Sequence, residues 1–263
     1  MKLITGGSGF LGKEFLKKID NYFSLDRNKG HDILAHGLGL NGIDKGTITE
    51  IWHFAGSVNL NGKDVYRVNV EGIENLISFA YQCRKLKRFV HISTAYVCGD
   101  RKGDVFADEL DLGQGFKNDY EKSKLIAEQR IIDSGLPYIV VRPSVVYCLN
   151  QINLIPWQGI AMVGGNIRIV GNENASLNII KLEDAVDLIL EHGNGDIGTR
   201  QHAVSPQNTS MGELRDMICH KLKVSDIEYV GECVDTPNRY EKAYDRITKA
   251  FQPYMLIDDP VFR

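Results

Sequence analysis

The sequence predicts an α/β fold, a doubly wound parallel sheet with a smaller C-terminal lobe. Short apolar segments alternate with amphipathic segments at helical spacing as far as Pro143, which is typical of βαβ units. The apolar segments also lack the polar alternation of a half-exposed strand, as in Arg88–Ser93 (RFVHIS) and Tyr138–Val141 (YIVV). Strands of this kind occur in parallel sheets that are covered on both faces.

The first strand and helix lie at the N-terminus. Lys2–Thr5 is a short apolar strand that ends at Gly6-Gly7. The apolar residues that follow at helical spacing are Phe10, Leu11, Phe15 and Ile19. Tyr22–Leu25 is predicted to be a weak second strand, so the chain begins as strand, glycine turn, helix and strand.

Three further strands continue the alternation. Buried strands are predicted at Glu50–Ala55, Arg88–Ser93 and Tyr138–Val141. The segments between them, Asn69–Tyr81 and Asn118–Asp133, place apolar residues on one helical face.

After Pro143 the alternation loosens. Asn150–Asn174 is rich in Gly and Asn, and we expect an irregular lobe there. Leu177–Ile180, a helix at Glu183–Glu191 and a strand near Gln201–Val204 are expected to return the chain to the main sheet. We therefore predict a sheet domain of residues 1–149 plus 176–203 and a substrate-binding lobe of residues 150–175 plus 204–263.

The composition argues against several classes of protein. The 263 residues carry a net charge of -3 and no concentrated basic face, which argues against nucleic-acid binding. The five cysteines include no C-x-x-C pair, so free thiols are expected rather than disulfides or a metal site. No apolar run approaches the roughly 20 residues of a membrane span, and the N-terminus does not resemble a signal peptide. We expect a cytoplasmic protein without nucleic-acid, membrane or metal partners.

The glycine turn at Thr5–Gly12 (TGGSGFLG) predicts dinucleotide binding. It satisfies G-x-G-x-x-G, directly follows a strand and opens an amphipathic helix. A tight turn, close approach of a pyrophosphate and close helix–strand packing each favour glycine, and the helix N-terminus then faces the phosphates. The residues expected to bind the cofactor here are Gly6, Gly9, Phe10, Leu11 and Gly12. A purely structural turn is the alternative.

The end of the second strand is expected to select between NAD and NADP. Asp26 can accept hydrogen bonds from the ribose hydroxyls of NAD, whereas Arg27 can bind the 2′-phosphate of NADP. The position of Asp26 relative to Gly9 slightly favours NAD. The alternative is that both residues are surface charges of a loop.

Tyr120 and Lys124 form a Y-x-x-x-K pattern within a predicted helix. Residues four apart share a helical face, so the ammonium is expected near the phenol. A free phenol has a pKa of about 10, and a nearby cation favours its ionised form. Tyr120 could then exchange a proton with a carbinol oxygen while hydride is transferred. The pattern alone is common by chance.

A hydroxyl at the end of a neighbouring strand strengthens this interpretation. Thr94 follows the predicted strand Arg88–Ser93, and ligands of parallel sheets lie beyond the carboxyl ends of the strands. Thr94 could hydrogen-bond the substrate oxygen, with Ser93 as the less favoured alternative.

The chain resembles the extended short-chain dehydrogenase/reductase superfamily over nearly its whole length, most strongly from Ile51 to Ser144. Within it, the chain is most similar to the thioester reductase and fatty acyl-CoA reductase-like branch. The motifs that carry the resemblance are Thr5–Gly12, HFAG at 53–56, NVEG at 69–72, STAYVCG at 93–99, F-x-N-x-Y-E-x-S-K at 116–124, RPS at 142–144, and PNRYE with FQPYM near the end.

The resemblance implies specific roles. Thr94 would bind the substrate oxygen, Tyr120 would be the general acid/base, and Lys124 would bind the nicotinamide ribose and lower the phenol pKa. Asn69 would order the helix behind the site and support a proton-relay water. The further cofactor contacts implied are Asp32 at the adenine, Ala55 and Gly56 along the cofactor, and Pro143 and Ser144 at the nicotinamide.

The chain also departs from the family pattern. The region between the first helix and Glu50 is heavily shortened, which makes adenosine binding less secure than the catalytic residues. Tyr147-Cys148 replaces the usual Gly-Asp, and packing is the favoured role of Cys148. His53 is interpreted as a strand-end residue without a catalytic role.

Three functions remain open. The favoured one is an NAD(P)-dependent oxidoreductase that reduces acyl thioesters, aldehydes or related carbonyls. A nucleotide-sugar epimerase would use the same residues with transient oxidation. A non-catalytic dinucleotide-binding regulator is the third, although such proteins typically lose the Tyr or Lys. A small-molecule substrate is expected, and a homodimer is expected by analogy only.

Overall fold

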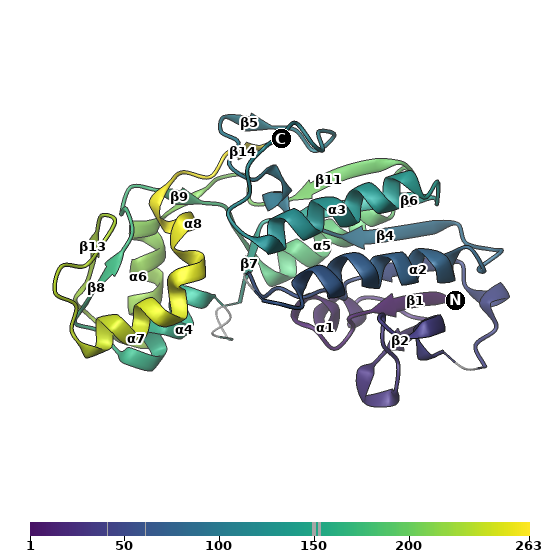
Figure 1. The fold of residues 1–263 in the computed structure, drawn as a ribbon, viewed down its shortest axis with the longest axis horizontal. Coiled ribbons are helices and arrows are strands. Elements are labelled where there is room, and N and C mark those ends of the chain that lie inside the picture. Colours follow the sequence, from purple (N-terminus) through teal and green to yellow (C-terminus); the bar gives the residue numbers. More distant parts are fainter. Residues whose placement is uncertain (41, 61, 149–150, 152–153) are drawn as a thin grey trace.

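The computed structural model describes residues 1–40, 42–60, 62–148, 151 and 154–263, and it confirms the predicted α/β sheet (Figure 1). Six parallel strands form the main sheet in the order β11-β6-β4-β3-β1-β2. These strands are β1 (Lys2–Thr5), β2 (Tyr22–Leu25), β3 (Glu50–His53), β4 (Arg88–Ile92), β6 (Tyr138–Pro143) and β11 (Thr199–Ala203).

Helices cover both faces of this sheet. In Figure 1, α2 (Gly72–Ala80) and α3 (Asp119–Asp133) lie in front of it, whereas α5 (Leu182–Gly193) lies behind it near α1 (Phe10–Leu16). Successive strand residues alternate between the two cores, so Leu3 packs with α2 and α3 and Ile4 packs with α1 and α5. Each fully buried large apolar side chain contributes on the order of 1.5–3 kcal/mol.

The order in which the chain adds strands to the sheet reverses at β1, because β2 joins one side of β1 and β3 joins the other. Strand β1 lies between β2 on one side and β3 on the other, with Thr5 opposite His53 in the register. Ligands of open α/β sheets bind at such a switch point, beyond the carboxyl ends of the strands. The fold therefore predicts a ligand site beside Gly6 and Phe54.

The predicted shortening after β2 is confirmed. In the described part of residues 26–49 the chain forms only short 3₁₀ turns, at Arg27–Lys29, His36–Gly39 and Lys45–Thr47. No further strand or helix extends the sheet beyond β2 in this described segment, so β2 is the edge strand.

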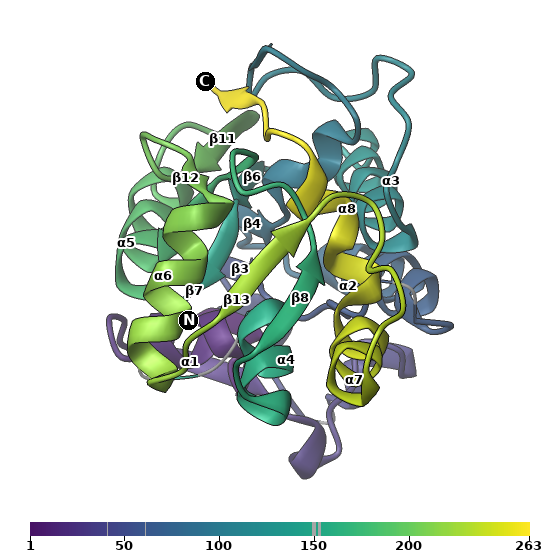
Figure 2. The same cartoon turned by 90° about the vertical axis from the view of Figure 1, so that its left-hand side faces the viewer.

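The smaller lobe is more regular than we predicted. It lies to one side of the sheet domain in Figure 1 and is viewed end-on in Figure 2. The described part of residues 150–174 contains a helix and a strand, because Pro156, Trp157 and Ile160 bury one helical face. The elements of the lobe are α4 (Ile155–Val163), β8 (Ile167–Val170), α6 (Met211–Leu222), β13 (Ile227–Val230), α7 (Arg239–Thr248) and α8 (Gln252–Leu256).

Trp157, Met211 and Tyr244 belong to a separate buried cluster that holds the lobe together. The proposed division into residues 1–149 plus 176–203 and 150–175 plus 204–263 stays a proposal. Its boundary at residues 149 and 150 lies outside the described residues.

Short strands connect the lobe to the sheet domain. We expected Leu177–Ile180 to rejoin the main sheet, but β10 (Ile179–Lys181) pairs instead with β7 (Val145–Tyr147) in a two-stranded sheet. The strand predicted near Gln201 does join the main sheet, as β11. The remaining pairs are β9 (Ser176–Leu177) with β12 (Thr209–Ser210), and β5 (Asp104–Val105) with β14 (Val261–Phe262). Among the residues that the structure describes, no helix has both the length and the apolar character needed to cross a membrane.

Candidate active site

The glycine turn after β1 packs against the neighbouring strand too closely for side chains. Gly6 has a φ of +72°, and a Cβ there would lie 2.5 Å from the Ala55 nitrogen. A Cβ at Gly12 would lie 2.2 Å from the Gly6 carbonyl oxygen, which accepts a hydrogen bond from the Gly9 N–H at 2.9 Å. The turn thus leaves backbone groups bare at the carboxyl end of β1, as dinucleotide binding requires.

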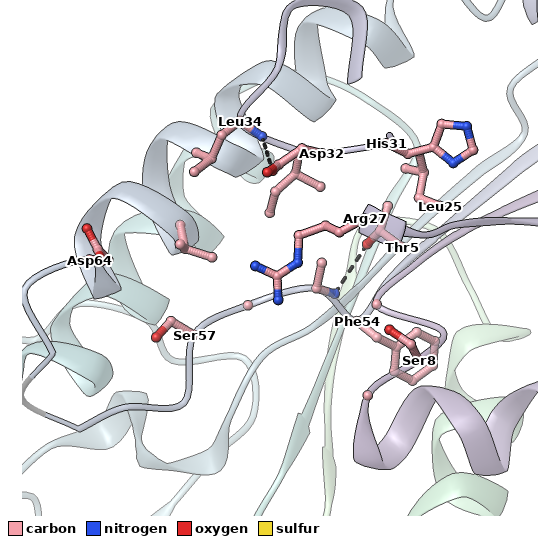
Figure 3. A pocket seen from close by; sticks show the side chains of 16 residues that line it. Thr5, Ser8, Leu25, Arg27, His31, Asp32, Leu34, Phe54, Ser57 and Asp64 are labelled. Atoms are coloured by element: carbon pink, nitrogen blue, oxygen red, sulfur yellow. Dashed lines mark hydrogen bonds between the residues drawn. The ribbon is translucent and has the colours of Figure 1, made fainter. Parts of the chain in front are cut away.

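A cavity of about 410 Å³ opens at the switch point beside this turn (Figure 3). Six of the predicted cofactor residues line it: Gly6, Gly9, Arg27, Asp32, Ala55 and Gly56. The sequence did not single out the other lining residues, which are Thr5, Ser8, Leu25, His31, Ile33, Leu34, Phe54, Ser57, Asp64 and Val68. The sequence could have identified Phe54 and Ser57 as lining residues, because they closely follow a buried strand.

The other predicted cofactor residues do not line this cavity. Phe10 and Leu11 pack against the core on the α1 and α5 face, and Gly12 packs against the glycine turn itself. Lys124, Pro143 and Ser144 lie elsewhere along the same edge of the sheet, at α3 and β6.

The side chains of Asp26 and Arg27 point in different directions. The Asp26 carboxylate caps the short turn after β2 and accepts a hydrogen bond from the Asn28 N–H at 3.0 Å, and it does not line the cavity. Figure 3 shows the Arg27 guanidinium extending into the cavity, toward Asp32 and Ser57. Asp32 accepts a hydrogen bond from the Leu34 N–H at 2.9 Å. Within the described part of the chain, Arg27 has no ion-pair partner.

Thr94 and Tyr120 meet at the carboxyl end of β4. Thr94 is 4% exposed and accepts a hydrogen bond from the Tyr96 N–H at 3.3 Å, which leaves its hydroxyl hydrogen free. The Tyr120 phenol lies close to this hydroxyl. Burial of the phenol raises the pKa of Tyr120 to about 12; the interaction with Thr94 acts in the opposite direction, and Glu121 adds to the increase.

Asn118 places Tyr120 at the start of α3. The Asn118 side chain accepts a hydrogen bond from the Glu121 N–H at 3.0 Å, which is a helix N-cap. This cap fixes where the helix begins, so that the first turn carries the phenol toward Thr94.

Lys124, one turn along α3, directs its ammonium into the sheet. Its Nζ donates a hydrogen bond to the Ile92 carbonyl at 2.7 Å and lies 3.3 Å from His91 Nε2. Burial lowers the pKa of Lys124 to about 8, with Glu128 acting in the opposite direction. This differs from our expectation that the ammonium lowers the phenol pKa, because burial dominates at Tyr120.

Asn69 joins the cavity wall to α3. It lies in a π-helical turn, Arg67–Glu71, a distortion that often accompanies functional sites. Its amide oxygen accepts from the Ser57 N–H at 2.7 Å, and its nitrogen donates to the Ser57 carbonyl at 3.1 Å and to the Ser123 Oγ at 2.9 Å. Ser123 in turn donates to the Tyr120 carbonyl at 2.8 Å. These hydrogen bonds connect Asn69 to α3, so they can order that helix as expected. The relay water stays a prediction.

Two buried hydroxyls share this edge of the sheet. Ser93 and Ser144, at the ends of β4 and β6, have no hydrogen-bond partner for Oγ among the described residues. Buried polar groups without a partner are uncommon and destabilising, so such groups suggest a ligand that completes them.

Residues 32–182 match the family whose description is male sterility protein. Two curated relatives are a 2-alkyl-3-oxoalkanoate reductase of Stenotrophomonas maltophilia and a putative fatty acyl-CoA reductase of Arabidopsis thaliana. The first is 25% identical over 205 residues, which cover 70% of this chain and 62% of that protein. The second is 29% identical over 131 residues, which cover 50% of this chain and 28% of that protein. The chain thus spans less than two thirds of either relative.

Among solved structures, the terminal R domain of the myxalamid PKS-NRPS pathway superposes with a TM-score of 0.71 and 20% identity. The superposition covers 87% of this chain and 71% of that domain, and at this identity it shows the shared fold.

Proposed function

The chain belongs to the male sterility protein family, in the fatty acyl-CoA reductase-like branch of the extended short-chain dehydrogenase/reductases, and from this premise we propose a nicotinamide-dependent reductase. Its proposed substrate is an acyl thioester or a related carbonyl compound. The observation that carries the proposal is that the buried Thr94 hydroxyl and the Tyr120 phenol face each other at the carboxyl edge of the sheet.

The residues at this edge fit a dinucleotide. The glycine turn leaves no space for a Cβ at Gly6 or Gly12, and the cavity of about 410 Å³ lies at the switch point. Gly6, Gly9, Ala55 and Gly56 would hold the cofactor, with Lys124 at its ribose. When bound, the nicotinamide supplies the hydride for the reaction.

The state of Tyr120 supports reduction rather than oxidation. A phenol with a pKa of about 12 keeps its proton at neutral pH, so Tyr120 can donate that proton to the carbonyl oxygen as the oxygen gains negative charge. Thr94 would donate a second hydrogen bond to the same oxygen. The charge would therefore develop at a position that the hydroxyls of Thr94 and Tyr120 already face.

We propose NADP(H) as the preferred form of the cofactor. The sequence slightly favoured NAD because of Asp26, but that carboxylate caps a turn and does not line the cavity. The Arg27 guanidinium extends into the cavity and could bind a 2′-phosphate bidentately. This geometry supports the alternative that the sequence left open.

A cofactor-consumption assay tests the proposed function. The chain is mixed with NADPH or NADH and a panel of fatty acyl-CoAs, aldehydes and nucleotide sugars, and loss of reduced cofactor is followed. Steady consumption with a thioester or aldehyde is expected, and Tyr120→Phe should lower the rate by about 10²–10⁴-fold. Tyr81→Phe, at the exposed residue that follows α2 and outside the cavity, is the matched control and should keep the rate.

Two outcomes would contradict the proposal. Interconversion of nucleotide sugars without net cofactor consumption would identify an epimerase. Cofactor binding without turnover of any substrate, unchanged by Tyr120→Phe, would identify a regulator.

A further inference from the structure

Two buried histidines lie between the glycine turn and the catalytic helix. His53 is the last residue of β3, and His91 lies within β4. The two residues are paired in the sheet register, and each is 1% exposed. Their rings stack with centroids 5.2 Å apart and an interplanar angle of 24°. The proposed catalytic steps use neither of them.

Hydrogen bonds tie both rings to their neighbours. Thr5 Oγ1 accepts from the Ala55 N–H at 3.2 Å and lies 2.6 Å from His53 Nδ1, in a hydrogen bond whose direction depends on the His53 tautomer. The Lys124 ammonium can only donate, so His91 Nε2 is an acceptor and the proton of His91 is on Nδ1. Burial, assisted by Lys124, lowers the pKa of His53 to about 3 and that of His91 well below its usual range. Both imidazoles are therefore neutral at physiological pH.

The surroundings leave Lys124 with few acceptors. Glu128, on the same helix, is in a buried ion pair with Arg142 of β6, at 2.7 Å. Among the described residues, the ammonium contacts the Ile92 carbonyl and His91 Nε2. An ammonium has three N–H donors, so these two contacts leave one for a ligand.

We propose that His91 is a positioning residue for the reductase: its Nε2 holds the Lys124 ammonium at the end of β4 so that the remaining N–H serves the cofactor ribose. This inference rests on the proposed function. The Nδ1 of His91 has no hydrogen-bond partner among the described residues, although it is buried. An apolar side chain would avoid that destabilising group, so the retained imidazole is consistent with a requirement for Nε2.

Two amide variants separate this role from simple packing. In His91→Gln the amide oxygen can reach the position of Nε2, whereas in His91→Asn it reaches only the position of Nδ1. The two side chains have the same chemistry and differ by one methylene group. His91→Phe removes both nitrogens and keeps the ring, and Phe89→Leu, on the same face of β4, is the control for core disturbance.

The measurement is the affinity for NADPH as a function of pH, by fluorescence, with no substrate present. In the parent protein the affinity should fall as pH rises through about 8, where Lys124 loses its proton. In His91→Asn and His91→Phe the midpoint should shift to lower pH by about one to two units, the size expected for a lost hydrogen bond to a charged group. His91→Gln and Phe89→Leu should keep the parent midpoint.

Different failures have different meanings. Parent-like midpoints in both His91→Asn and His91→Phe, or an equal shift in Phe89→Leu, would overturn the inference and leave the proposed function intact. A parent affinity without a pH midpoint near 8 would also overturn it. If the parent binds neither NADPH nor NADH at any pH, the proposed function fails and this inference fails with it.

Discussion

The two ends of the proposed cofactor site are built differently. At the catalytic end, Thr94, Tyr120 and Lys124 belong to a strand end and a long helix, and buried side chains hold them in place. At the adenosine end, short 3₁₀ turns replace a strand and a helix. There, the Asp26 carboxylate accepts a hydrogen bond from the backbone N–H two residues later, at 3.0 Å, in an exposed turn. Asp44 does the same at 2.9 Å farther along the shortened segment, near the amino end of the sheet.

This difference suggests how an α/β enzyme can be shortened. Acid–base chemistry needs atoms held to within fractions of an ångström, which buried contacts provide. Adenosine contributes binding energy rather than chemistry, so looser turns suffice for it. We therefore expect changes at the catalytic end to affect stability and rate, and changes at the adenosine end to affect cofactor affinity.

The largest effect is expected beneath the catalytic end. Glu128→Gln leaves the Arg142 guanidinium buried without its counter-charge, and should lower the free energy of unfolding by about 3–5 kcal/mol. Chemical denaturation measures this. Arg130→Gln, which breaks the half-exposed pair with Glu74, is the control and should cost less than about 1 kcal/mol. Equal losses in the two variants would contradict the expected contrast.

The next largest effect concerns rate. Thr94→Val removes the hydroxyl that faces the phenol and should reduce kcat by about 10²–10³-fold, because one hydrogen-bond donor to the developing charge is lost. The affinity for NADPH should stay within about twofold of the parent value, because a hydroxyl that stabilises the transition state need not bind the cofactor. Thr94→Ser should recover most of the rate. A large loss of cofactor affinity with an unchanged kcat would contradict the assignment of Thr94 to the chemical step and would place it in cofactor binding instead.

Arg27→Leu should produce the opposite pattern. Loss of charge-assisted hydrogen bonds to the 2′-phosphate is expected to weaken NADPH binding by about 10–100-fold, with little change for NADH and none in kcat at saturating cofactor. Titrations with both cofactors measure the ratio. Arg84→Leu, outside the cavity, is the control. An unchanged NADPH to NADH ratio would support NAD as the cofactor.

The smallest effect is expected in the shortened segment itself. Asp44→Ala removes the acceptor for the Gly46 N–H and should cost about 1 kcal/mol or less of stability, with the rate unchanged. Asp44→Asn keeps an acceptor and should match the parent. A loss above about 3 kcal/mol, in the range for a buried ion pair, would show that this segment is as tightly packed as the catalytic end.

Backbone features of this molecule followed from the sequence better than side-chain directions did. The glycine turn, the buried strands and the positions of Thr94 and Tyr120 follow from spacing and strand ends, which local sequence determines. The direction of Lys124 does not, because its partners His91 and Ile92 come from a strand far away in the sequence. A local interaction explains why Arg27 rather than Asp26 lines the cavity, since a capping hydrogen bond from the Asn28 N–H holds the Asp26 carboxylate.

The lobe also shows what composition conceals. The Gly and Asn residues of Asn150–Asn174 suggested an irregular segment, but those at 164–166 and 171–174 occupy the turns between elements, where Asn166 has a φ of +58°. Pro156, Trp157 and Ile160 are buried on one face of α4, and the Gly-rich surroundings made that helical pattern harder to recognise.

The pairing of β14 with β5 restricts how the lobe can move. The Val261 N–H donates to the Gly103 carbonyl at 2.9 Å and the Arg263 N–H to the Val105 carbonyl at 2.8 Å, in the segment that links Thr94 to Tyr120. The lobe is consequently tethered to the sheet domain at both of its boundaries. The Tyr254 phenol of α8 adds to these tethers, because it accepts a hydrogen bond from the Asn118 amide and donates one to the Glu121 carboxylate, each at 2.6 Å. A lobe held at all these points is expected to move little relative to Thr94 and Tyr120, and grafting a foreign lobe would require transplanting both tethers and the Tyr254 contacts.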